Sequence, residues 1–165
     1  GKRLLILGAG GATRGILQPL LDQQPTEICI ANRTVAKAEA LADYFSRLSA
    51  LDEESGKGLV SISGCGFSDL DSSSFDWIIN ATSASLQGEM PTLPAGLVNA
   101  DTWCYDLMYA AELTPFGVWA RAAGAAKVMD GLGMLVEQAA ESFNLWRGVR
   151  PKTQEVIAML RTSAS

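Results

Sequence analysis

Short apolar runs alternate along the chain with longer segments in which apolar residues recur every three or four positions. Runs rich in Leu, Ile, Val, Trp and Cys, without polar alternation, are typical of strands that are buried on both faces. Such runs predict strands at residues 3–7, 27–31, 59–62, 77–80, 103–107 and 127–129. The helical periodicity predicts helices at residues 12–21, 35–48, 114–123, 132–147 and 153–161.

Strands that alternate with helices predict an α/β fold. We expect a Rossmann-like, doubly wound parallel sheet of about six strands with helices on both faces. Polar connections are expected at residues 49–58 and 63–76, the second with at most one short turn, and a proline-interrupted connection at residues 84–102. The 165 residues are enough for one well-packed domain, which we place at residues 1–130, followed by helices within residues 131–165.

The helix expected at residues 132–147 is apolar nearly all round, unlike a helix that turns one face to solvent. It should therefore pack on a surface that this domain does not contain. The chain also opens at Gly1 without a methionine, directly at the edge of its first strand. From these two features we expect the chain to be a piece of a longer protein.

Composition excludes several classes of function. The net charge is −5 and no basic run occurs, which argues against a nucleic-acid surface and means that an anionic ligand must be bound by a local arrangement. No apolar stretch reaches membrane-spanning length and no signal peptide is recognisable, so we expect a cytoplasmic protein without a membrane contact.

Cysteine and histidine counts narrow the chemistry further. The three cysteines have no C-x-x-C spacing, so we expect buried free thiols in a reducing compartment, at Cys29, Cys65 and Cys104. Histidine is absent, which excludes a Ser-His-Asp triad and a histidine-based metal site, and we expect no metal.

A glycine-rich turn follows the first apolar run. Gly8, Gly10 and Gly11 come directly before a helical pattern, as in folds that hold a dinucleotide pyrophosphate at a helix N-terminus. The strict G-x-G-x-x-G fingerprint is not met, because Thr13 stands at the third position, with Gly15 two residues later. The context of strand, turn and helix favours nucleotide binding over a purely structural turn.

The end of the second expected strand bears on the type of cofactor. In NAD-binding folds a carboxylate about 20 residues after the glycines binds the ribose 2′-hydroxyl. Here that position is Asn32, followed by Arg33, Thr34 and, one turn later, Lys37. Arginine can hold a 2′-phosphate with two hydrogen bonds and lysine adds a positive charge, which favours NADP over NAD. The alternative is a solvated helix start.

Polar residues also follow the fourth expected strand. The segment from Asn80 to Ser83, which includes Thr82, lies at the carboxyl edge of the predicted sheet, where ligands bind in open α/β folds. An ordinary turn built by Asn, Ser and Thr side chains would have the same pattern, and spacing alone does not separate the two.

Several short segments together resemble the shikimate dehydrogenase family. In chain order they are GAGGA (8–12), NRT (32–34), NATS (80–83), YDLMY (105–109) with TPF (114–116), and DGLGMLV (130–136) with QAA (138–140). The resemblance covers almost the whole chain, and the last block is the most specific. It is a resemblance to the C-terminal, NADP-binding half of that family together with its C-terminal helices.

The resemblance implies the reversible, NADPH-dependent reduction of 3-dehydroshikimate to shikimate, in the pathway to aromatic amino acids. It implies that the pyrophosphate is held by Gly8, Ala9, Gly10, Gly11 and Ala12. It places the adenosine 2′-phosphate at Asn32, Arg33, Thr34 and Lys37. It places the nicotinamide and the path to it at Thr82, Ser83, Leu107, Gly131 and Met134. Tyr109 and Gln138 would reach the small-molecule substrate.

Departures from the family pattern qualify these implications. Ser85 and Leu86 stand where many members carry glycine, which we interpret as loop variation. The family's acid–base pair, a lysine and an aspartate, belongs to an N-terminal substrate domain, and no segment here matches it. We therefore expect no catalytic residue in this chain, binding of NADP without turnover, and C-terminal helices that pack back on the missing domain. Their exposed apolar surface would favour self-association.

Three other hypotheses stay open at this point. A quinate/shikimate dehydrogenase that uses NAD is a close relative, although Arg33 speaks against it. A non-catalytic, NADP-binding regulatory module would also lack the acid–base pair. Another NADP-binding enzyme with a similar core, such as a glutamyl-tRNA reductase, is disfavoured by the block from Asp130 to Gln138.

Overall fold

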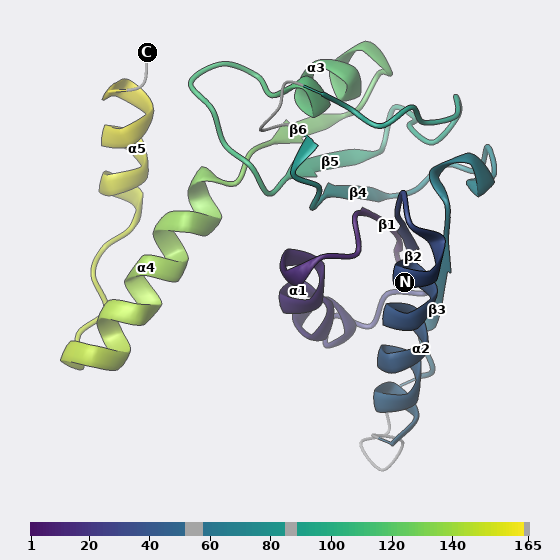
Figure 1. The fold of residues 1–165 in the computed structure, drawn as a ribbon. Coiled ribbons are helices and arrows are strands. Elements are labelled where there is room, and N and C mark those ends of the chain that lie inside the picture. Colours follow the sequence, from purple (N-terminus) through teal and green to yellow (C-terminus); the bar gives the residue numbers. More distant parts are fainter. Residues whose placement is uncertain (52–57, 85–88, 164–165) are drawn as a thin grey trace.

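A single six-stranded sheet forms the centre of the computed structural model, which describes residues 1–51, 58–84 and 89–163 (Figure 1). The strands lie in the order β3-β2-β1-β4-β5-β6, and each neighbouring pair is parallel. Their bounds are Arg3–Leu7 (β1), Glu27–Ala31 (β2), Ser61–Cys65 (β3), Trp77–Asn80 (β4), Trp103–Asp106 (β5) and Lys127–Met129 (β6). The order reverses between β1 and β4, which confirms the predicted doubly wound fold.

Helices cover both faces of the sheet, as predicted. Their bounds are Gly11–Leu21 (α1), Val35–Leu51 (α2), Pro115–Ala122 (α3), Leu132–Arg147 (α4) and Gln154–Ser163 (α5), with a short 3-10 helix, η2, at Phe67–Asp69. Figure 1 shows α1 and α2 on one side of the sheet and α3 on the other. Among the described helices, none has the length and apolarity needed to cross a membrane.

Two core layers follow from the alternation of side chains along each strand. In β1, Leu4 and Ile6 pack toward the side of α1 and α2, whereas Leu5 and Leu7 belong to the layer that contains Phe116 of α3. Strands buried on both faces read as continuous apolar runs, which is why β1, β2 and β4 have the predicted bounds. The bounds of the edge strand β6 were also predicted correctly.

The edge strand β3 differs from the prediction. It runs over Ser61–Cys65 instead of residues 59–62, because its register pairs Ser61 with Glu27 and Cys65 with Ala31 of β2. An edge strand is only half covered, so its polar alternating residues gave no apolar signal. The predicted loop at 63–76 was therefore wrong in its first residues, whereas η2 is the one short turn that was expected within it.

Smaller corrections concern the ends of other elements. Helix α2 continues to Leu51, so the loop predicted at 49–58 begins later, and most of it lies outside the described residues. Strand β5 ends at Asp106, one residue earlier than predicted. Thr114 precedes α3 as its N-cap, where its hydroxyl accepts a hydrogen bond from the Gly117 amide. The departures at residues 85 and 86 lie outside the described residues.

Helices α4 and α5 form a hairpin that extends from the sheet in Figure 1. Polar contacts hold the hairpin together: Arg150 pairs with Glu137 at 2.9 Å and with Glu141. Arg161 of α5 donates two hydrogen bonds, of 2.7 and 3.0 Å, to Asp130, which precedes α4. Large apolar side chains of α4 stay exposed, with Trp146 at 81%. Part of the helix is thus uncovered within this chain, as predicted.

Candidate functional site

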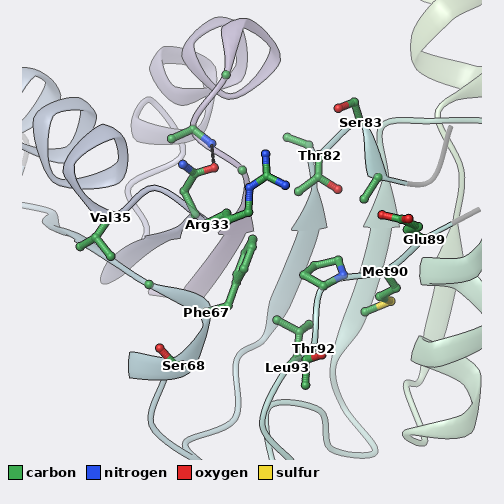
Figure 2. A pocket seen from close by; sticks show the side chains of 18 of the residues that line it. Arg33, Val35, Phe67, Ser68, Thr82, Ser83, Glu89, Met90, Thr92 and Leu93 are labelled. Atoms are coloured by element: carbon green, nitrogen blue, oxygen red, sulfur yellow. Dashed lines mark hydrogen bonds between the residues drawn. The ribbon is translucent and has the colours of Figure 1, made fainter. Parts of the chain in front are cut away.

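A groove of about 1030 Å³ lies at the carboxyl edge of the sheet, where the turns after β1, β2, β3 and β4 meet (Figure 2). Nine residues that the sequence predicted to bind a cofactor line it together, namely Gly8, Ala9, Gly10, Gly11, Ala12, Asn32, Arg33, Thr82 and Ser83. They come from three separate segments of the chain. Their convergence on one groove is a consequence of the strand order, because β1 lies between β2 and β4.

The space around each glycine of the turn differs. Gly8 has φ +102°, and a Cβ there would lie 3.0 Å from the Ala81 carbonyl oxygen, so both the backbone conformation and the available space require glycine. A Cβ at Gly10 or Gly11 would meet no atom within 4 Å. These two positions line the groove, and the space beside them is open.

The helix that follows the turn adds hydrogen-bond donors. Helix α1 begins at Gly11, and its N-cap, Gly10, makes no side-chain capping bond to the amides of the first turn. Unpaired amides at a helix N-terminus, with the positive end of the helix dipole, bind anions such as phosphate. Thr13, which breaks the strict fingerprint, is fully buried and donates to the Gly8 carbonyl at 2.7 Å. That bond fastens the turn to the helix.

Asn32 connects the glycine turn to the loop after β2. Its Oδ1 accepts a hydrogen bond from the Ala9 amide at 3.2 Å, and its Nδ2 donates to the Thr34 carbonyl at 2.9 Å. A carboxylate in this place could not make the second bond, because it has no donor. The side chain of Arg33 is exposed and lies over the groove in Figure 2.

Sequence reasoning missed one wall of the groove. Gly66, Phe67 and Ser68, which follow β3, line it, as do residues 89–94. Figure 2 shows Phe67 on the side of Arg33, with Thr82 and Met90 opposite. The prediction ended β3 too early, so the residues after its true end were not placed at the sheet edge. A correct register for that strand would have been the signal for Phe67.

The residues predicted at the nicotinamide end do not all line the groove. Thr82 and Ser83 do, whereas the others lie at the turn between β6 and α4 or beside a second hollow. The β6–α4 turn touches the loop after β5, since the Gly131 amide donates to the Met108 carbonyl at 3.0 Å. A Cβ on Gly131 would come within 2.1 Å of the Leu107 carbonyl oxygen. Leu107 itself lines a second hollow of about 650 Å³, between α1, the sheet and α4, with Met134 and Gln138.

Four predicted residues line neither hollow in the described part of the chain. Thr34 and Lys37 are exposed beside Arg33, at the start of α2. Tyr109 is half exposed, in the loop after β5, and Gly131 is buried in the turn described above.

The charged groups of the groove suit binding better than proton transfer. Among the described residues that line it, Arg33 is the cation and Glu89 the carboxylate, and no lysine is present. The cysteines are free, as predicted, but Cys65 is half-buried, unlike the buried Cys29 and Cys104. Burial raises the pKa of Cys65 to about 12, helped by the neighbouring Cys29, whose sulfur is 3.7 Å away. The site can hold and orient an anionic ligand, but it offers no acid–base pair.

Comparison with known families gives two matches at the two ends of the chain. Residues 1–57 match the family described as "Shikimate / quinate 5-dehydrogenase", and residues 131–161 match "Shikimate 5'-dehydrogenase C-terminal domain". A curated relative from Marinobacter nauticus, named "Shikimate dehydrogenase (NADP(+))", is 54% identical over 98% of this chain. The match covers 56% of that relative, so the chain spans about half the length of the curated relatives it matches.

Solved structures give the same relationship. An Ael1 enzyme from Pseudomonas putida is 48% identical with a TM-score of 0.77, covering 96% of this chain and 54% of the other. A shikimate dehydrogenase crystallised in complex with NADP+ is 33% identical with a TM-score of 0.74, covering 99% of this chain and 55% of the other.

Proposed function

Since this chain belongs to the shikimate dehydrogenase family, we propose that it is the cofactor-binding part of an NADP-dependent shikimate dehydrogenase. The whole enzyme would reduce 3-dehydroshikimate to shikimate reversibly. The observation that carries the proposal is the single groove in which the glycine turn, the Asn32–Arg33 loop and Thr82 meet.

A dinucleotide phosphate fits the features of this groove. The space in front of Gly10 and Gly11 and the uncapped N-terminus of α1 suit a pyrophosphate. Arg33, with Thr34 and Lys37 next to it, suits the adenosine 2′-phosphate, and Asn32 in place of a carboxylate avoids repulsion of that phosphate. When bound, NADPH would supply the hydride for carbonyl reduction.

The remaining predicted residues would act at the reacting end. The main chain at Leu107 and Gly131, which are in contact, would hold the carboxamide of the nicotinamide, with Met134 packed near the ring. Tyr109 and Gln138 are both exposed, as residues that reach a substrate held by another domain need to be.

Carbonyl reduction also needs a proton donor, which the described part of the groove lacks. We therefore infer that this chain alone binds NADP without appreciable turnover, and that a substrate domain supplies the acid–base pair. The apolar hollow beside α4 and the exposed side chains of Phe143 and Trp146 are surfaces on which residues 131–165 would pack against that domain. Without it, the same surfaces favour self-association.

The test is shikimate oxidation with NADP+, followed by absorbance at 340 nm, for this chain and for a protein that joins it to the substrate domain of a family member. We expect turnover only in the joined protein. Turnover by this chain alone, at a rate comparable to that of the joined protein, would overturn the inference that the substrate domain supplies the acid–base pair. A joined, folded protein that binds NADP+ but leaves shikimate unchanged would overturn the assignment of shikimate as the substrate.

A further inference from the structure

A buried carboxylate connects the loops at the ends of β4 and β5. Asp106, the last residue of β5, is 1% exposed. Its Oδ1 accepts hydrogen bonds from the Nδ2 of Asn80 and from the Met108 amide, each of 3.0 Å. Its Oδ2 accepts a hydrogen bond of 2.6 Å from the hydroxyl of Thr114, the N-cap of α3.

Asn80 links Asp106 to the groove by hydrogen bonds on both sides of its amide group. It is 2% exposed, at the end of β4, and its Oδ1 accepts hydrogen bonds from the amide and the hydroxyl of Thr82, of 3.2 and 2.8 Å. The orientation of the Asn80 amide is set by its two neighbours, because Nδ2 must face the acceptor Asp106 and Oδ1 must face the donors of Thr82. Thr82 lines the groove.

The same carboxylate orients a second loop. Through the Met108 amide it holds the segment whose carbonyl at Met108 accepts a hydrogen bond from Gly131, and whose Leu107 carbonyl lies against Gly131. Asp106 thus joins the groove wall at Thr82 to the turn at Gly131. Hydrogen bonds to a buried charged group are worth more than neutral ones, and they lose most when one partner is removed.

We propose that Asp106, acting through Asn80 and Met108, is a positioning residue that sets the nicotinamide half of the cofactor site and leaves the adenosine half unaffected. The inference rests on the proposed function, since it assumes that the groove binds NADP. The adenosine half is built separately, from the glycine turn and the Asn32 loop, which are joined to each other by the bond between Ala9 and Asn32.

A pair of ligands separates the two halves experimentally. NADP+ would touch both, whereas adenosine 2′,5′-bisphosphate lacks the nicotinamide and would touch only the adenosine half. Calorimetric titration of this chain with each ligand gives a ratio of affinities that a general loss of stability would not change. Asp106→Ala removes the acceptor from both loops and is expected to weaken NADP+ binding about tenfold, with the bisphosphate changed by less than about twofold.

Two variants serve as matched controls. Asp106→Asn keeps an oxygen for Asn80 and Met108 when its amide nitrogen faces Thr114, so it should retain the ratio. Thr114→Ala removes a hydrogen bond to the same carboxylate on the side of α3 and should lower the melting temperature without changing the ratio. Asn80→Ser breaks the connection from the other strand and should act like Asp106→Ala, which provides a second test if the first variant does not fold.

Each result has one meaning. A reduced ratio in Asp106→Ala or Asn80→Ser, with a normal ratio in the controls, supports the proposal. An unchanged ratio, an equal loss of both ligands, or loss of folding in both variants assigns Asp106 to stability alone and overturns it. Equal affinity of the unaltered chain for both ligands overturns it as well, but leaves NADP binding intact. Failure of the unaltered chain to bind either ligand refutes the proposed function itself.

Discussion

Replacement of Gly131 by alanine tests how tightly the β6–α4 turn is packed on the loop after β5. The backbone at Gly131 has φ −76° and ψ 0°, which other residues can adopt, so only the available space requires glycine here. An added Cβ would lie 2.1 Å from the carbonyl oxygen and 2.7 Å from the carbonyl carbon of Leu107. Both are main-chain atoms, so one of the two segments must move.

The cost follows from that displacement. Overpacking of a buried site by one methyl group destabilises by about 1–3 kcal/mol, and the upper end applies because no flexible side chain can yield. The move would also stretch the 3.0 Å hydrogen bond from the Gly131 amide to Met108. For a domain of this size, 1–3 kcal/mol lowers the melting temperature by roughly 2–12 °C.

The assay is thermal unfolding followed by circular dichroism, with Gly133→Ala as the control. Gly133 lies two residues further, in the first turn of α4, and its Cβ would meet no atom within 4 Å. That variant should be neutral or gain up to about 1 kcal/mol from helix propensity. Equal melting temperatures for the two variants would contradict the packing that the structure gives to Gly131.

Three further predictions concern other parts of the chain. Gly11→Ala adds a methyl group at a residue that lines the groove, where it would touch no protein atom within 4 Å, so the melting temperature should not change. Calorimetry should record NADP+ binding about tenfold weaker or worse, and an unchanged affinity would contradict the placement of the pyrophosphate at this turn. The half-buried Cys65, whose pKa is raised to about 12 mainly by desolvation, should react with iodoacetamide at pH 8 at least about tenfold more slowly in the folded chain than in urea. Equal rates in the two states would contradict the raised pKa. The pKa of Asp76 is lowered below its ordinary value of 3.8 by the hydrogen bond from the Arg3 amide and then by Lys2, so the ionised side chain stabilises the fold above pH 3.8 and this stabilisation is lost as the pH falls below that value. Asp76→Asn should therefore reduce the dependence of the melting temperature on pH at acid pH, and an unchanged dependence would contradict this.

The sequence was most informative where a strand is buried on both faces. β1 and β2 read as unbroken apolar runs, and their bounds were predicted correctly together with the glycine turn and the Asn32–Arg33 loop that follow them. These parts depend on local patterns, so the sequence alone could place the glycine turn and the Asn32–Arg33 loop at the same edge of the sheet.

What the sequence did not contain depends on register and on long-range packing. The edge strand β3 alternates polar and apolar residues, so its end, and with it Phe67 in the groove wall, could not be located. The hydrogen bonds that Asp106 accepts from Asn80 and Thr114 join it to residues 26 and 8 positions away, and no periodic pattern in the sequence predicts them. Pairings of this kind follow only from the order of the strands.

The proposed function depends above all on recognition of the 2′-phosphate of NADP by the groove. Calorimetric titration of this chain with NADP+ and, separately, with NAD+ tests it most directly, and Arg33→Gln provides the matched variant. We expect binding of NADP+, much weaker binding of NAD+, and loss of the difference between the two in Arg33→Gln. Equal binding of both cofactors by the unaltered chain, or a preference for NAD+, would contradict it.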